Sequence, residues 1–145
     1  MDAWTIFFRL LATFILSFIF GLERQKRTHK PVSFGTFIFV ASGACALAIA
    51  GLTLAPDNPL PLLGAIITGI GFLGAGALIK TSDKITGFTS AATIWVFAIF
   101  GLIIGVGEYF PAGLLYAIIW IVFFVDGYLE DRGIGSYQKK VVILT

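Results

Sequence analysis

Five long apolar blocks dominate this sequence and restrict the folds that it can adopt. Each has about 18–23 residues, and a helix rises ~1.5 Å per residue, so each block is long enough to cross a ~30 Å hydrocarbon core. Hydrophobic residues make up 58% of the chain and charged residues 12%, which leaves too little polar surface for a soluble globule. We therefore predict an all-α membrane protein with about five transmembrane helices, at Ala3–Leu22, Val32–Leu54, Leu60–Ile79, Gly87–Gly107 and Ala112–Leu129.

Basic residues occupy every other connection between these blocks. The second and fourth connections contain Asp57 and Glu108 and no Lys or Arg. This alternation is the pattern that the positive-inside bias produces. It predicts a multi-pass protein with its N-terminus outside and its C-terminus in the cytoplasm. The basic connections are the first, the third and the tail, with Arg24, Lys26, Arg27, Lys30, Lys80, Lys84, Arg132, Lys139 and Lys140.

The composition changes after the fifth block. Residues 139–145, Lys-Lys-Val-Val-Ile-Leu-Thr, are typical of the opening of a short strand. They are either the start of a soluble domain or an ordered tail, and the sequence leaves both open. We divide the chain into a transmembrane domain, residues 1–132, and a cytoplasmic tail, residues 133–145.

Chemistry that depends on cysteine, histidine or nucleic acid is disfavoured. The chain has one Cys, Cys45 in an apolar block, and one His, His29 in a basic connection. Neither a nucleophile–base set nor a metal triad is visible, so we expect no enzymatic activity, cofactor or metal centre. The net charge of +2 is concentrated in short connections and suits lipid headgroups better than nucleic acid.

The third block is rich in small residues. Gly64, Thr68, Gly71 and Ala75 follow a spacing of i, i+4, i+7 and i+11, which places them in one groove of a helix. Such grooves let helices approach closely in lipid, and we predict a docking surface within one protomer or between two. The alternative is a segment that unwinds locally around a ligand. The predicted packing residues are Gly64, Thr68, Gly69, Gly71, Gly74, Ala75 and Gly76.

The fourth block opens with hydroxyl side chains on one helix face. Thr86, Thr89, Ser90 and Thr93 recur at i, i+3, i+4 and i+7. One interpretation is local: the hydroxyls cap the helix or bond to carbonyls one turn back. The other is a polar site opposite the glycine groove.

Ionisable residues at membrane depth are costly and are therefore candidates for function. Arg24 and Asp126 lie near the cytoplasmic ends of the first and fifth blocks and could form an ion pair, leaving Glu23 to face a partner or a cation. Alternatively, all three contact water and headgroups. Arg9 is expected to snorkel to the outer surface, within reach of Glu108. The candidate polar site is Glu23, Arg24, Gln25, Thr89, Ser90, Thr93 and Asp126.

Three motifs in order resemble the membrane domain of the MgtC/SapB family, over about residues 21–109. They are Gly21-Leu-Glu-Arg-Gln25, Gly69-Ile-Gly-Phe-Leu-Gly-Ala-Gly76 and Gly87-Phe-Thr-Ser-Ala-Ala-Thr-Ile-Trp95, followed by Gly101, Gly105 and Gly107. The resemblance implies a bacterial or archaeal inner-membrane protein linked to growth at low magnesium and, in some pathogens, to intracellular survival. It also implies a regulator of other membrane proteins, including the proton-translocating ATP synthase, and a homo-oligomer is compatible with it.

The chain departs from the family pattern at several charged positions. Gly35-Thr36-Phe37 stands where the family usually has Arg-Thr-His, and Thr86 stands where it often has Arg. These departures weaken the transfer of a particular partner or ligand. The alternative function is a magnesium or other cation transporter or channel. Magnesium takes about six oxygen ligands, and one chain offers few carboxylates at membrane depth, although a symmetric oligomer would multiply them.

Overall fold

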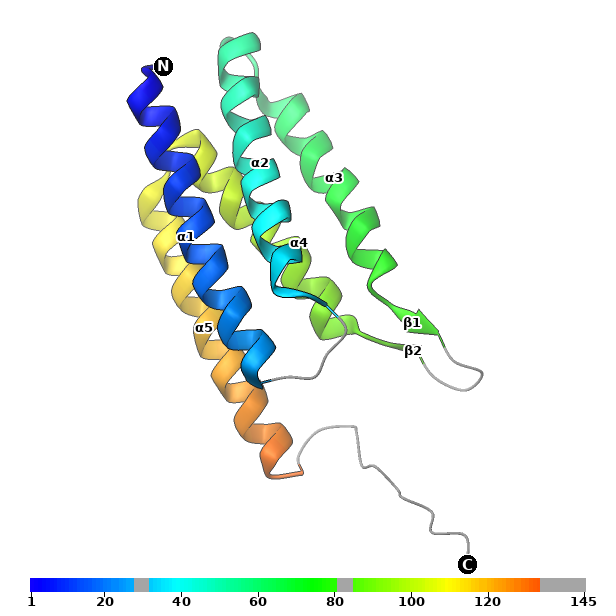
Figure 1. Cartoon of the computed structure of the whole chain (residues 1–145). Coiled ribbons are helices and arrows are strands. Elements are labelled where there is room, and N and C mark those ends of the chain that lie inside the picture. Colours follow the sequence, from blue (N-terminus) through cyan, green and yellow to red (C-terminus); the bar gives the residue numbers. More distant parts are fainter. Residues whose placement is uncertain (28–31, 81–84, 134–145) are drawn as a thin grey trace, which may run out of the picture.

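The computed structural model describes residues 1–27, 32–80 and 85–133, and it contains five long helices (Figure 1). Successive helices run in opposite directions, so the C-terminal ends of α1, α3 and α5 lie together. Lys26, Arg27 and Arg132 are at this end, which we call the basic end. Whether it faces the cytoplasm stays a prediction. The helices are α1 (Ala3–Arg27), α2 (Phe34–Leu54), α3 (Leu60–Gly76), α4 (Phe88–Val106) and α5 (Tyr109–Asp131).

Four of the five helices, α1, α2, α4 and α5, are long and apolar enough to cross a membrane by length and composition. The predicted all-α class is confirmed. The predicted third block was too long, because α3 ends at Gly76 after 17 residues, or about 25 Å. The chain then enters a short antiparallel ladder of β1 (Ile79–Lys80) and β2 (Ile85–Thr86). A fifth span therefore stays a prediction, and the strand predicted at 139–145 lies outside the described residues.

The limits of the other helices follow from the residues that bound them. Gly87 precedes α4 and Gly107 follows it, each with φ of +97°, a left-handed conformation that suits glycine. At Gly107 this conformation ends the helix. Helix α1 runs past its apolar block to Arg27, where basic residues are favourable at a helix C-terminus. Helix α5 starts at Tyr109, and Pro111 lies in its first turn. Proline is tolerated there because the backbone N–H groups of the first turn have no partner within the helix.

Helices α2 and α4 form the closest backbone contact of the bundle. A Cβ atom added at Gly101 would overlap the carbonyl oxygen of Ala41, and one added at Gly105 would lie 2.6 Å from the carbonyl oxygen of Cys45. Ala41, Cys45 and Ala48 are each 0% exposed. We call this contact, made by Gly101 and Gly105 against these three residues of α2, the glycine seam. Its small side chains allow the two backbones to approach closely.

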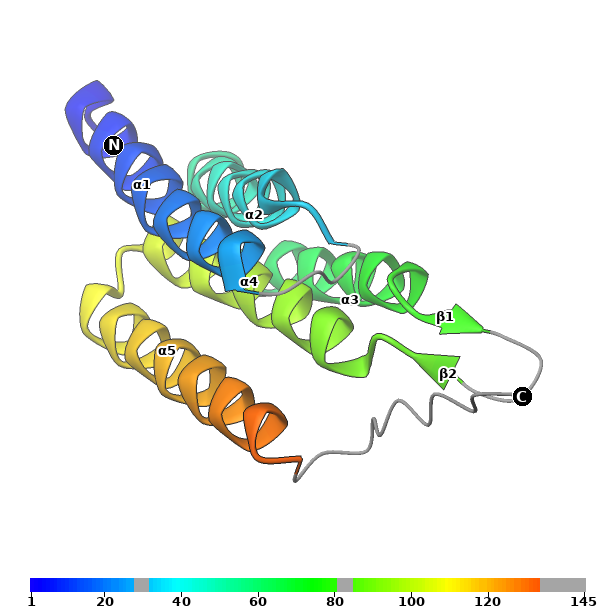
Figure 2. The same ribbon diagram turned by 60° about the horizontal axis from the view of Figure 1, so that its bottom comes forward.

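Helix α5 joins the bundle mainly through aromatic side chains. The ring of Phe20 in α1 lies 5.5 Å from that of Trp120 and 5.3 Å from that of Phe123. The Tyr116 hydroxyl donates a hydrogen bond to the Leu16 carbonyl of α1 at 2.8 Å. In Figure 2 the ribbon of α5 stands apart from that of α1, and the ring contacts of Phe20 with Trp120 and Phe123 join the two helices.

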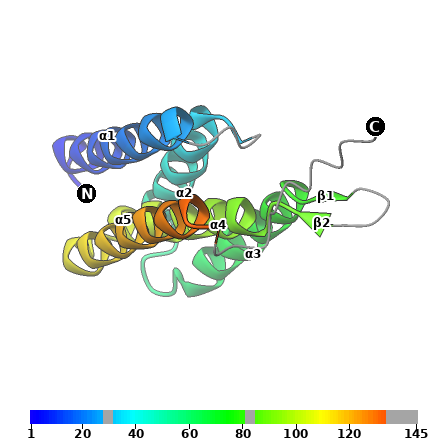
Figure 3. The same ribbon diagram turned by 90° about the horizontal axis from the view of Figure 1, so that it is seen from below.

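Helix α3 lies at the edge of the bundle, on the opposite side from α1 (Figures 1 and 3). A Cβ atom at Gly74 would lie 3.2 Å from the Ala91 carbonyl oxygen of α4, and this contact places Gly74 in the interior.

The predicted groove on α3 points outward. Added Cβ atoms at Gly64, Gly69, Gly71 and Gly76 would meet nothing within 4 Å. We call the face made by Gly64, Thr68, Gly71 and Ala75 the open face. Docking of this face within the protomer is therefore not seen among the described residues, and docking onto a second protein stays a prediction.

Candidate functional site

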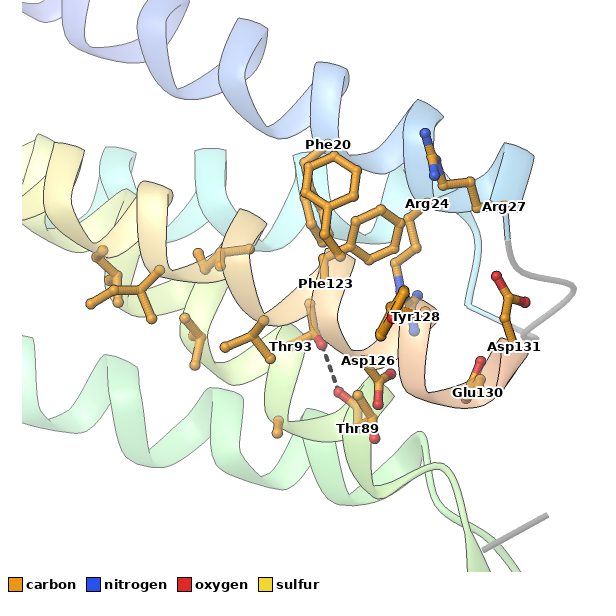
Figure 4. Close-up of a pocket in the computed structure, with 18 residues that line it drawn as sticks. Phe20, Arg24, Arg27, Thr89, Thr93, Phe123, Asp126, Tyr128, Glu130 and Asp131 are labelled. Atoms are coloured by element: carbon orange, nitrogen blue, oxygen red, sulfur yellow. Dashed lines mark hydrogen bonds between the residues drawn. The ribbon is translucent and has the colours of Figure 1, made fainter. Parts of the chain in front are cut away.

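A cavity of about 610 Å³ lies between α1, α4 and α5 at the basic end of the bundle (Figure 4). We call it the α5 cavity, because most of its lining comes from α5. Its charged and hydroxyl-bearing lining residues are Arg24, Arg27, Thr89, Thr93, Asp126, Tyr128, Glu130 and Asp131.

Arg24 is the buried centre of this site. It is 4% exposed, and its Nη2 donates a hydrogen bond of 2.8 Å to the Ser90 hydroxyl. Its guanidinium carbon lies 5.0 Å from the centre of the Phe37 ring. Burying a guanidinium is costly, and the Ser90 hydroxyl supplies an acceptor for its Nη2. Arg24 thus links α1 to both α2 and α4.

Asp126 of α5 lines the same cavity and interacts electrostatically with Arg24. The structure therefore brings together the two residues that the sequence predicted to be partners. A direct ion pair between them stays a prediction.

Glu23 and Gln25 lie outside the lining of the cavity. Glu23 forms a salt bridge with Arg27, one turn later on α1. Its predicted role of facing a partner or a cation stays a prediction. The side-chain oxygen of Gln25 accepts a hydrogen bond of 3.2 Å from the Phe34 backbone N–H, at the start of α2. Gln25 therefore joins α1 to the start of α2. The guanidinium carbon of Arg27 lies 5.3 Å from the centre of the Phe124 ring of α5.

The hydroxyl residues of α4 divide between two roles. Ser90 faces Arg24, whereas Thr89 and Thr93 line the cavity. The Thr93 hydroxyl also donates a hydrogen bond of 2.6 Å to the Thr89 carbonyl, as the local interpretation predicted (Figure 4). Among the described hydroxyls of α4, Ser90 contacts α1, and Thr89 and Thr93 line the cavity between α1, α4 and α5. The alternative of a polar site opposite the α3 groove stays a prediction. The side chain of Thr86 lies outside the described part.

Four charged or hydroxyl-bearing residues of the lining were missed as site residues in the sequence: Arg27, Tyr128, Glu130 and Asp131. The predicted fifth block ended at Leu129, whereas the helix continues to Asp131. Glu130 could have been predicted from its spacing, because it lies four residues after Asp126 and therefore shares a helix face with it.

Arg9, which was expected to snorkel to the outer surface, is held by hydrogen bonds at the other end of the bundle. Its Nη1 donates to the Gly105 carbonyl at 2.7 Å, and its Nε donates to the Tyr109 hydroxyl at 3.0 Å. A cation is favourable at the C-terminal end of a helix, here that of α4. Arg9 therefore joins α1 to the α4–α5 turn, and its partners there differ from the predicted Glu108.

Metal ligands are sparse in this arrangement. Within residues 1–27, 32–80 and 85–133, no group of three or more His, Cys, Asp or Glu side chains is placed to hold a metal ion.

Comparison with known families identifies the family of this chain. A sequence model described as the MgtC family matches residues 10–132, a range that includes every residue lining the α5 cavity. The chain belongs to the MgtC family. Together with its long apolar helices, this membership makes it an all-α, multi-pass membrane protein. No solved structure matches the chain.

Similar proteins come from several bacteria. Protein MgtC of Salmonella typhimurium (strain LT2) is 36% identical over 100 residues, which cover 69% of this chain and 43% of that protein. Protein SapB of Bacillus subtilis is 36% identical over 121 residues, with 75% and 52% covered. Protein SrpB of Synechococcus elongatus is 32% identical over 115 residues, with 69% and 63% covered. The chain thus spans about half the length of these relatives.

Proposed function

We propose that this protein is a non-enzymatic regulator or interaction partner of other integral membrane proteins. It acts in the inner (plasma) membrane and serves adaptation to low magnesium. Membership of the MgtC family supports the link to magnesium. By family resemblance, the proton-translocating ATP synthase is one candidate partner.

The observation that carries this proposal is the open face of α3. Helices associate in lipid by bringing small residues together, as the glycine seam does inside this protein. The open face has the same kind of residues, yet Cβ atoms added at Gly64 and Gly71 would meet nothing. Beside it, Phe72 is 86% exposed and offers apolar contact area. A helix of another membrane protein would find both close backbone access and a large side chain to pack against.

Co-purification from native membranes tests this proposal. We expect Gly71→Leu to lose the proteins retained by the wild type, because the added side chain keeps a partner helix away. Gly43→Leu is the matched control, since a Cβ atom added at Gly43 on α2 would likewise meet nothing within 4 Å. Identical protein profiles for the wild type and both variants would contradict a regulatory role through α3.

A cation transporter is the second candidate, favoured by the carboxylates of Asp126, Glu130 and Asp131 along the α5 cavity. Magnesium uptake into proteoliposomes containing the purified protein distinguishes the two functions. The regulatory proposal expects uptake equal to that of empty vesicles. Sustained magnesium uptake that the Asp126→Asn variant abolishes would contradict the regulatory proposal and support transport.

A further inference from the structure

The guanidinium groups at the basic end of the α5 cavity are engaged inside the protein. Arg24 donates a hydrogen bond to the Ser90 hydroxyl and interacts electrostatically with Asp126. Arg27 forms a salt bridge with Glu23. This end of the cavity therefore does not call for a charged ligand, and the rest of the lining decides which molecule fits.

The rest of the lining on α5 is apolar over the depth of one lipid leaflet. It begins at Leu115, and its first ionisable residue is Asp126, eleven residues later, or about 16 Å along the helix. Every lining residue of α5 between these two is aliphatic or aromatic. Half of a ~30 Å hydrocarbon core is ~15 Å, which is the depth that the acyl chains of one leaflet occupy. The apolar walls include Phe20, Val96, Ile118, Ile119, Val122 and Phe123.

The cavity also opens sideways, toward the surface that a membrane protein presents to lipid. Ile118 and Val122 line the cavity and are nevertheless 54% and 56% exposed, so they form part of its rim. Figure 2 shows the ribbon of α5 standing apart from that of α1 on this side. In a bilayer the medium at such an opening is hydrocarbon, and an apolar cavity does not retain water.

A helix of another protein would not fit between α1 and α5. The Phe20 ring contacts the rings of Trp120 and Phe123, and the Tyr116 hydroxyl donates a hydrogen bond to the Leu16 carbonyl. An inserted helix, ~10–12 Å across with its side chains, would have to break these contacts. An acyl chain is thin and flexible and can lie beside the rings.

We propose that the apolar part of the α5 cavity binds one acyl chain of a phospholipid from the leaflet at the basic end. The chain lies against the aliphatic walls of α4 and α5 and the Phe20 ring (Figure 4). It supplies dispersion contacts to side chains that would otherwise border a void. The headgroup stays at the membrane surface and is not selected. This site does not depend on the regulatory role proposed for α3.

Competition between headgroups tests the proposal on the wild-type protein. The protein is reconstituted in vesicles with equal amounts of phosphatidylethanolamine, phosphatidylcholine and phosphatidylglycerol that carry the same acyl chains. It is then extracted into mild detergent, and native mass spectrometry identifies the retained lipid.

We expect one phospholipid per protein chain, with the three headgroups retained within about twofold of one another, because one hydrogen bond to a charged headgroup would give about tenfold or more. A wider preference would show that a headgroup is recognised and would overturn the proposal. So would the absence of retained phospholipid, or a retained molecule of another class.

A cavity-filling variant locates the acyl chain. Ala92 is exposed and lines the cavity, so Ala92→Phe should lower lipid retention several-fold. Ala117→Phe is the matched control, because Ala117 is also exposed and is not part of the lining. Equal retention by the two variants would place the lipid elsewhere and overturn the assignment.

Thermal unfolding in detergent with increasing phospholipid gives an independent measurement. A ligand that binds the folded state raises the unfolding temperature, so that of the wild type and of Ala117→Phe should rise with phospholipid concentration. The rise should be smaller for Ala92→Phe, whose ring occupies the site, and for Ala92→Leu, a milder change if the first variant does not fold. A wild-type temperature that phospholipid leaves unchanged, or an equal rise in the Ala92 variants, would overturn the proposal.

Discussion

Helices α3 and α4 both carry glycines at helical spacing, but they use them in opposite ways. On α4, Gly101 and Gly105 lie against the backbone of α2 in the glycine seam, and an added methyl group would collide there. On α3, Gly64 and Gly71 face outward with nothing within 4 Å. The same residue type thus closes one contact inside the protein and leaves another surface accessible.

The difference shows that a small-residue stripe needs a counterpart on the neighbouring helix. Helix α2 supplies one with Ala41, Cys45 and Ala48, spaced at i, i+4 and i+7. On α3 the close contact is limited to Gly74, which lies beside the backbone of Ala91. Glycine spacing indicates where another helix can pack closely. Whether a helix of the same protein packs there depends on whether that helix carries matching small residues.

The largest expected effect is that of Gly101→Ala. The new Cβ atom would overlap the Ala41 carbonyl oxygen, and a backbone atom cannot move aside as a flexible side chain does. We expect a loss of about 3 kcal/mol of stability, the upper part of the range for overpacking. Thermal unfolding in detergent measures it. A wild-type melting temperature would show that α2 and α4 are not packed as described.

A smaller loss is expected for Gly105→Ala, roughly 2 kcal/mol by the same mechanism. The new Cβ atom would lie 2.6 Å from the Cys45 carbonyl oxygen and 2.8 Å from the Ala48 Cβ. Adding Ala48→Gly removes one of these contacts, so the double variant should recover part of the loss. Purely additive effects in a double-mutant cycle would argue against the contact between Gly105 and Ala48.

For Gly74→Ala we expect a loss of no more than about 1 kcal/mol. The added Cβ atom would lie 3.2 Å from the Ala91 carbonyl oxygen, and α3 at the edge of the bundle can shift by a few tenths of an ångström. Unfolding in detergent should therefore rank this variant between the seam variants and those of the open face. A loss as large as that of Gly101→Ala would mean that α3 is held as tightly as α4.

The smallest effect, of opposite sign, is expected for Gly71→Ala. With nothing within 4 Å, the methyl group costs no packing, and replacing glycine by alanine in a helix gains about 0.5–1 kcal/mol. The purified protein should unfold at a slightly higher temperature. Destabilisation instead would reveal that the open face is already covered in the purified state.

The sequence predicted the helices well because each is defined by local features. Long apolar blocks located all five, and Gly87 and Gly107 marked both ends of α4. The errors lie at those helix ends where the apolar block and the helical backbone end at different residues. Helix α1 continues through charged residues to Arg27, and α3 stops at Gly76 although the apolar run continues to Ile79. Apolar length alone does not report where a helix ends.

The site was less predictable, since it depends on which faces meet. The sequence placed Arg24 and Asp126 at similar depth, and both line the α5 cavity. It could not show that Ser90 is the hydrogen-bond acceptor of Arg24, because that contact joins residues 66 positions apart. The sequence also could not identify the salt-bridge partner of Glu23. Arg27 lies one turn away, but it is one of several nearby cations.

The attachment of α5 through aromatic rings has a consequence for biosynthesis. The rings of Phe20, Phe37 and Phe97 already pack against one another from α1, α2 and α4, all of which leave the ribosome before α5. Lipid tails can cover the outer side of Phe20 until Trp120 and Phe123 arrive. We therefore expect the first four helices to assemble during translation, with α5 docking last onto a surface that lipid has kept apolar.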